Sequence, residues 1–135
     1  MKQNTDRLVI IGGGNIGSAI AEGVAASGLL KASAITVCDK SAPLLAALKA
    51  KGFTTSDDNC AALAKPATVL VAVKPHHADA VLAEIAPALA TSKHVLVSVM
   101  AGVSIAQLRQ FAGDKVPVVR AMPNTAIAWL RFSAG

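Results

Sequence analysis

The 135 residues suffice for one domain with a substantial buried core and are too few for two domains of ordinary size. Hydrophobic residues make up 53% of the chain and charged residues 16%, so the chain is more apolar than an average soluble domain. Its apolar stretches are short and end at glycine, proline or charged residues, and none approaches the roughly 20 residues of a membrane span. We therefore expect a soluble chain without a membrane partner.

Thirteen Lys and Arg against eight Asp and Glu give a net charge of +5, which favours anionic partners. These charges are scattered, and the aromatic residues are not interleaved with them as stacking platforms for bases would be, so we expect no nucleic-acid partner. The polar residues 1–7 lead straight into an apolar run without a signal sequence, which favours a cytoplasmic location. Cys38 and Cys60 have no metal-ligand spacing, so we expect reduced thiols and no metal site.

Short apolar, β-branched runs bounded by glycine, proline or charge predict buried strands. Six such runs occur, at residues 7–11, 34–38, 53–55, 68–73, 94–99 and 116–121. Apolar residues at three- and four-residue spacing, together with capping residues, predict helices at residues 15–27, 41–52, 57–64, 76–90 and from 104 onward. This alternation predicts an α/β fold with a doubly wound, mostly parallel sheet of the Rossmann type.

A glycine-rich turn links the first predicted strand to the first predicted helix. Gly12, Gly14 and Gly17 satisfy the pattern G-x-G-x-x-G in the strand-turn-helix context that gives the pattern meaning. Gly12 would allow the tight turn, Gly14 the approach of a pyrophosphate, and Gly17 close packing of helix on strand. The alternative is that these glycines only form a tight turn, but their context favours a dinucleotide site at a helix N-terminus.

Asp39 ends the second predicted strand, where an acidic residue commonly accepts hydrogen bonds from the adenosine ribose of NAD. Its carboxylate would repel the 2′-phosphate of NADP, yet Lys40 and Ser41 follow directly and could hold a phosphate. The choice between NAD and NADP therefore stays open at this point. A solvated loop acid is the alternative interpretation of Asp39.

Lys74 and Pro75 follow the fourth predicted strand, at the edge where open α/β sheets bind ligands. Lys74 could face anionic groups of a cofactor or substrate, or it could be a solvated loop cation. His76 and His77 are expected to cap or solvate the next helix rather than to take part in catalysis.

Together these residues resemble the pyrroline-5-carboxylate reductase family, whose members reduce a cyclic imine to proline. Four ordered blocks carry the resemblance, and their order and spacing are more specific than any one of them. They are Ile11-Gly12-Gly13-Gly14-Asn15-Ile16-Gly17-Ser18-Ala19-Ile20, Val71-Ala72-Val73-Lys74-Pro75, Val97-Ser98-Val99-Met100-Ala101-Gly102-Val103-Ser104-Ile105 and Val119-Arg120-Ala121-Met122-Pro123-Asn124-Thr125.

The resemblance implies a set of residues that contact NADP or NAD. For the pyrophosphate it implies Gly12, Gly13, Gly14, Asn15, Ile16 and Gly17. For the adenosine half it implies Asp39, Ser41 and Asn59, and Lys40 is added as a charge that could hold a phosphate. For the nicotinamide half it implies Ala72, Val73, Lys74, Pro75, Val99, Met100 and Ala101, with Pro123-Asn124 leading toward the cleft.

The implied reaction is hydride transfer from NADPH or NADH to pyrroline-5-carboxylate, and no residue of the chain is assigned as catalytic. We expect a dinucleotide-binding domain over residues 1–125. Residues 126–135 form an atypical tail, since Ala126 stands where the family usually has another proline. The family has a further helical domain that dimerises and completes the substrate site, and we expect this domain to be absent here. The parent protein would form a homo-oligomer through that domain. The isolated chain would bind cofactor with little turnover, because half of the cleft is missing.

Two other functions stay open. The chain could be a non-catalytic module that binds a dinucleotide to sense or regulate, because a fold does not determine a function. It could also belong to another Rossmann reductase, such as a hydroxyacid dehydrogenase. Apolar residues near the end of the chain, Ile127, Trp129, Leu130 and Phe132, predict self-association of the isolated chain.

Overall fold

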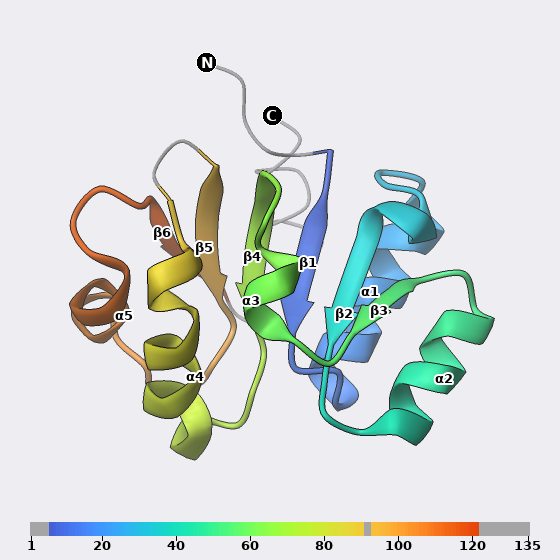
Figure 1. Cartoon of the computed structure of the whole chain (residues 1–135), viewed down its shortest axis with the longest axis horizontal. Coiled ribbons are helices and arrows are strands. Elements are labelled where there is room, and N and C mark those ends of the chain that lie inside the picture. The colour runs from blue at the N-terminus through green and yellow to red at the C-terminus, as the bar shows by residue number, and fades with distance from the viewer. Residues whose placement is uncertain (1–5, 91–92, 122–135) are drawn as a thin grey trace.

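The computed structural model describes residues 6–90 and 93–121, which form one parallel sheet flanked by helices (Figure 1). The strands are β1 (Leu8–Ile11), β2 (Ile35–Cys38), β3 (Thr54–Ser56), β4 (Ala67–Val71), β5 (His94–Ser98) and β6 (Val118–Arg120). The α-helices are α1 (Asn15–Ser27), α2 (Ala42–Ala50), α3 (Asn59–Ala62), α4 (Ala78–Ile85) and α5 (Ile105–Ala112). Three 3-10 turns complete the set, at Ala32–Ala34, Pro75–His77 and Ala86–Ala88.

The strand order is β3-β2-β1-β4-β5-β6, and every neighbouring pair is parallel. The order reverses between β1 and β4, whose registers align Leu8 with Thr68 and Ile11 with Val71. Ligands of open α/β sheets bind at the carboxyl ends of strands at this kind of reversal. The expected doubly wound Rossmann-type sheet is therefore confirmed.

Helices cover both faces of the sheet, so the central strands are buried on both sides. On one face α1 and α2 pack on β1 and β2 through residues such as Ile20, Val24 and Leu48. On the other face α3, α4 and α5 pack on β1, β4 and β5 through residues such as Leu82 and Leu108. Figure 1 shows α3 and α4 in front of the sheet and α1 behind it.

Most predicted helix ends are confirmed. Gly28 follows α1 in the left-handed conformation, with φ of 80°. The Ser41 and Ser104 hydroxyls cap α2 and α5 by accepting the amides of Leu44 and Gln107. The Gln107 side chain donates to Asp79 on α4 at 2.7 Å, which links α5 to α4.

The long helix predicted over residues 76–90 is wrong as a single element. A 3-10 turn, Pro75–His77, precedes the α-helix, and a second, Ala86–Ala88, follows it. Pro87 lacks the amide hydrogen that a continuing helix would need, and its ring crowds the preceding turn. The apolar side of α4 still faces the core as its spacing predicts, since Ala78, Leu82 and Ile85 are buried.

His94 at the start of β5 is a buried histidine whose ring contacts the backbone of Ala90 and Lys65. Its Nδ1 accepts the Ala90 amide at 3.0 Å, and its Nε2 is 3.2 Å from the Lys65 carbonyl oxygen. Nδ1 must therefore be unprotonated, with the ring proton on Nε2 directed at Lys65. Burial lowers the pKa of His94 below its usual 6.5.

We expect acid to destabilise the fold through His94. The unfolded chain binds a proton on this histidine below about pH 6.5, whereas the folded chain binds it only at lower pH. The free energy of unfolding, measured with urea, should therefore fall between pH 7.5 and 5.5. His94→Asn keeps an acceptor near Nδ1 and cannot titrate, so its unfolding should depend less on pH. Equal pH dependence in both proteins would contradict this assignment.

The predicted tail over residues 126–135, with Ile127, Trp129, Leu130 and Phe132, lies outside the described residues, as do Pro123 and Asn124. The domain limits 1–125 and 126–135 therefore stay predictions. No helix among the described residues is long and apolar enough to cross a membrane.

Candidate functional site

Gly12 turns the chain from β1 into the glycine loop with φ of +103°, a conformation that favours glycine. Its amide donates to the Cys38 carbonyl at 2.8 Å, which ties the loop to the end of β2. A Cβ at Gly12 would lie 3.0 Å from the backbone of Ala72, which follows β4. The loop is thus held between the ends of β2 and β4, where the strand order reverses.

Gly13 and Asp39 connect the glycine loop to the turn after β2. The Gly13 amide donates to Asp39 Oδ2 at 2.8 Å, and Ser18 Oγ donates to the Gly13 carbonyl at 2.6 Å. A Cβ at Gly13 would lie 2.9 Å from Leu44 Cδ2 and 3.1 Å from Val37 Cγ1. Gly13 therefore faces the protein interior, and its role is to let the loop approach Asp39.

Gly14 and Gly17 open helix α1. A Cβ at Gly17 would overlap the carbonyl oxygen of Gly12, so only glycine lets the helix pack this close to the strand. A Cβ at Gly14 would meet nothing within 4 Å, and no side chain caps the helix there. The first amides of a helix lack intrahelical acceptors and sit at the positive end of its dipole. The loop therefore offers an uncapped anion site facing open space.

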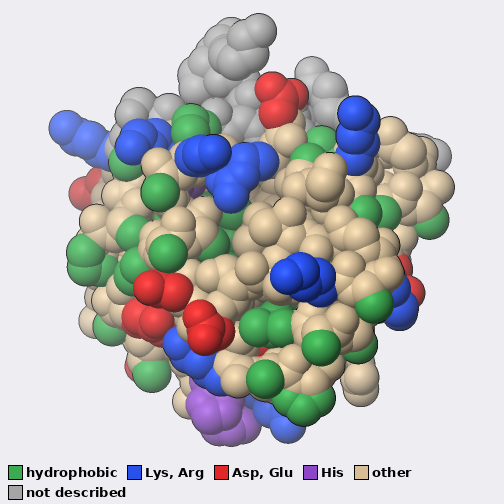
Figure 2. All heavy atoms as spheres, turned by 45° about the vertical axis from the view of Figure 1, so that its right-hand side comes forward, with side chains coloured by type: hydrophobic (Ala, Val, Ile, Leu, Met, Phe, Trp, Pro, Cys, Tyr) green, Lys and Arg blue, Asp and Glu red, His purple; other side chains and the backbone are tan. Residues whose placement is uncertain are grey.

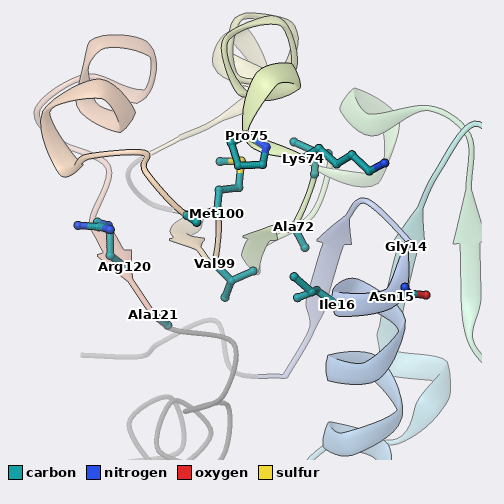
Figure 3. Close-up of a pocket in the computed structure, with 12 residues that line it drawn as sticks. Gly14, Asn15, Ile16, Ala72, Lys74, Pro75, Val99, Met100, Arg120 and Ala121 are labelled. Carbon is teal, nitrogen blue, oxygen red and sulfur yellow. The ribbon is translucent and has the colours of Figure 1, made fainter.

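A first cavity lies between α1 and the ends of β4, β5 and β6, and has a volume of about 630 Å³. Figure 3 shows Ile16 and Val99 directed toward each other across it, with Lys74 and Pro75 on the segment after β4. Its lining is Gly14, Asn15, Ile16, Ala72, Val73, Lys74, Pro75, Val99, Met100, Ala101, Arg120 and Ala121. Its walls are mostly apolar, as is usual where a flat ring binds.

The second cavity lies on the other side of the glycine loop, toward β2, and has a volume of about 430 Å³. Its lining is Ile11, Gly12, Gly14, Cys38, Asp39, Lys40, Asn59, Ala72, Val73, Lys74, His77, Val81 and Glu84. The buried Asn59 amide donates to Glu84 Oε1 at 3.2 Å, so α3 and α4 meet at this wall. The wall is more polar than that of the first cavity.

Four residues, Gly14, Ala72, Val73 and Lys74, line both cavities, so the cavities meet at the glycine loop. A dinucleotide has the same outline, with two nucleoside halves joined by a pyrophosphate. The uncapped end of α1 lies at the junction, where the pyrophosphate would be. The residues present therefore fit such a cofactor.

Most of the predicted site residues come together around the two cavities. Those that line one or both are Gly12, Gly14, Asn15, Ile16, Asp39, Lys40, Asn59, Ala72, Val73, Lys74, Pro75, Val99, Met100 and Ala101. Three do not line either one. Gly13 and Gly17 are buried behind the loop, and the Ser41 hydroxyl caps α2.

Sequence reasoning missed several lining residues, namely Ile11, Cys38, His77, Val81, Glu84, Arg120 and Ala121. Cys38 and Arg120 could have been found, since each ends a parallel strand and such ends meet at one edge. Glu84 and Val81 had no signal, because they lie within α4 and reach the cavity only through its packing. His77 occupies the N-cap position of α4 but makes no capping hydrogen bond.

Among the described residues, the lining of the first cavity contains two cationic side chains, Lys74 and Arg120, and no acidic side chain. The second contains Asp39 and Glu84 together with Lys40, Lys74 and His77. Burial raises the pKa of the Cys38 thiol to about 12, so this cysteine is not a nucleophile at neutral pH. Both cysteines are free thiols, as expected. Within residues 6–90 and 93–121, no three His, Cys, Asp or Glu side chains group to hold a metal ion.

An all-parallel sheet of this order, with a glycine-rich loop and an uncapped helix at its reversal point, defines a Rossmann-type dinucleotide-binding domain. The chain belongs to the family described as "NADP oxidoreductase coenzyme F420-dependent", whose model matches residues 7–102. The resemblance to the cofactor-binding part of pyrroline-5-carboxylate reductases is also confirmed by individual relatives.

Pyrroline-5-carboxylate reductase 1 of Dictyostelium discoideum is 35% identical over 127 residues, which cover 94% of this chain and 23% of that protein. The structure of a pyrroline-5-carboxylate reductase from Coxiella burnetii superposes with a TM-score of 0.82 at 32% identity, covering 88% of this chain and 44% of that one. The crystal structure of Plasmodium falciparum pyrroline carboxylate reductase with NADP bound gives a TM-score of 0.77 at 25% identity, covering 93% and 46%. The chain therefore spans less than half the length of these relatives.

Proposed function

We propose that this chain binds NADPH or NADH and forms the cofactor-binding part of an oxidoreductase that reduces pyrroline-5-carboxylate to proline. The observation that carries the cofactor proposal is the uncapped N-terminus of α1 at Gly14, placed between two cavities that share this residue. The named relatives support the reaction, because they are pyrroline-5-carboxylate reductases.

The cofactor, when bound, supplies the hydride, and the chain's own residues bind and orient it. Backbone amides at the start of α1 would hold the pyrophosphate, with Lys74 beside them at the junction of the cavities. The apolar walls at Ile16 and Val99 would hold the nicotinamide ring. Lys74 and Arg120 would attract the carboxylate of the substrate toward the same cavity.

A module that binds a dinucleotide without catalysing a reaction is the second candidate. It is favoured by the lining of the first cavity, whose described residues include no carboxylic acid, histidine or thiol to act in proton transfer. For this reason no catalytic residue is assigned among the described residues. The two candidates share the same binding site and differ only in whether turnover follows.

Two measurements on the purified chain test these proposals. Calorimetric titration with NAD+, NADH, NADP+ and NADPH should give saturable binding of at least one nucleotide, and no binding of any would overturn both candidates. Oxidation of NADH or NADPH is then followed with and without pyrroline-5-carboxylate, for this chain and for the longest open reading frame containing it. Substrate-dependent oxidation by either supports the reductase, whereas binding without any turnover supports the binding module.

A further inference from the structure

The carboxylate of Asp39 is held in place by both of its oxygens. Oδ2 accepts the Gly13 amide at 2.8 Å, and Oδ1 accepts the Ser41 amide at 2.9 Å. Asp39 is half-buried, and it lines the second cavity. Because its two bonds run to two different loops, the carboxylate cannot turn away from the cavity without breaking one of them.

The end of β2 is where the adenosine ribose meets the protein in dinucleotide-binding Rossmann domains. In NAD the ribose presents a 2′-hydroxyl, which can donate a hydrogen bond to a carboxylate. In NADP the same position carries a phosphate, which is anionic and has no comparable donor. A fixed carboxylate therefore attracts the 2′-hydroxyl of NAD and repels the 2′-phosphate of NADP.

Three neighbouring groups could offset this repulsion by binding the phosphate, and each of them either makes another hydrogen bond or lies at the far end of the cavity. Lys40 Nζ donates to the Asp57 carbonyl at 2.7 Å. Lys74 lies at the junction with the first cavity, which is the pyrophosphate end. The Ser41 hydroxyl accepts the Leu44 amide at 3.3 Å as the cap of α2.

A second carboxylate adds to the negative charge of the same cavity. Glu84 on α4 lines it and accepts a hydrogen bond from Asn59. Figure 2 shows acidic side chains gathered on the surface above the exposed histidines, with a basic side chain between them. His77, one of these histidines, lines the same cavity. The second cavity thus has two carboxylates, Asp39 and Glu84, while Lys40 is bonded to the Asp57 carbonyl and Lys74 lies at the pyrophosphate end.

We infer that the chain binds NAD(H) in preference to NADP(H), and that Asp39 is the residue that sets this preference. The inference rests on the proposed dinucleotide site and adds its specificity. It separates this chain from the Plasmodium falciparum relative, whose structure holds NADP.

The test compares the dissociation constants of NADH and NADPH for the unmodified chain at one low ionic strength. We expect NADH to bind roughly tenfold or more tightly than NADPH, as one fixed carboxylate close to a phosphate would produce. Asp39→Asn removes the charge and keeps one acceptor oxygen, so the ratio of the two constants should fall toward one. Raising the salt concentration should also narrow the ratio, since salt screens this repulsion.

One control variant separates a local effect from a change in net charge, and a second variant tests the lysine next to Asp39. Asp114→Asn makes the same charge change in the loop before β6, outside both cavity linings, and should leave the ratio unchanged. Lys40→Met tests whether the lysine leaves Asp57 to bind the phosphate. We expect the ratio to change by less than about twofold, because the ammonium group is engaged with a carbonyl.

These measurements distinguish a wrong inference about the NAD(H) preference from a wrong proposal of the dinucleotide site. If NADPH binds as tightly as NADH or more tightly, or if Lys40→Met selectively weakens NADPH, the inference fails while the proposed site stands. If no nucleotide binds, the proposed site fails and the inference with it. Should Asp39→Asn not fold, as judged by circular dichroism, the unmodified chain and Lys40→Met still decide the question.

Discussion

Valine in place of Gly14 is expected to reduce dinucleotide affinity at least about 100-fold while leaving the fold intact. A Cβ at this position meets no protein atom within 4 Å and points into space that both cavities share. The backbone has φ of −69° and ψ of −161°, an extended conformation that other residues adopt freely. The added methyl groups would therefore occupy the position of the pyrophosphate rather than disturb the protein.

Binding is measured by calorimetry with NADH and NADPH, and stability by urea unfolding. Gly14→Ala is the matched comparison, because alanine and valine are similarly poor at the N-cap but differ in bulk. Both variants should lose no more than about 1 kcal/mol of unfolding free energy, and valine should lose far more binding. Wild-type affinity in Gly14→Val would mean that no phosphate group approaches this loop.

Alanine in place of Gly17 is expected to destabilise the protein by about 3 kcal/mol or more. Its Cβ would overlap the Gly12 carbonyl oxygen and lie 3.3 Å from Ile10 Cγ2. The Gly12 backbone cannot retreat, because its amide is bonded to Cys38 and its α-carbon faces the Ala72 backbone. Helix α1 would have to move away from β1, which loosens the core and shifts the anion site as well.

Gly23 in the same helix provides the control for this prediction. It is exposed, and a Cβ there would meet nothing within 4 Å. Gly23→Ala should therefore stabilise the protein by about 0.5–1 kcal/mol, because alanine has the higher helix propensity. Urea unfolding of the two variants side by side should show opposite signs. A neutral effect of Gly17→Ala would mean that helix and strand are not in close contact at this point.

The glycines of the loop show which features of the site could be predicted from sequence. The pattern at Gly12, Gly14 and Gly17 correctly located the loop between β1 and α1, and the structure adds a distinct reason for each glycine. The contact of Gly13 with the cofactor stays a prediction, and the structure shows its amide bonded to Asp39 and its α-carbon facing the interior. Adjacent residues in a turn face opposite directions, and a motif alone does not reveal which of them the ligand meets.

For Asp39, too, the sequence predicted the position of the residue but not the direction of its side chain. Its position at the end of β2 was readable from the apolar run before it, whereas the orientation of its carboxylate was not. That orientation depends on the Gly13 and Ser41 amides, which come from two loops 28 residues apart in sequence (Gly13 to Ser41). Our inference on NAD against NADP, which the sequence leaves open, therefore rests on tertiary contacts.

The alternation of strands and helices, the glycine loop and the family resemblance could all be predicted from the amino-acid sequence, because they depend on local periodicity and on residue type at fixed spacing. The strand order and the arrival of Val81 and Glu84 at the second cavity became known from the three-dimensional structure alone. These features arise from packing between segments distant in sequence, where side-chain direction and helix placement are set by the sheet as a whole.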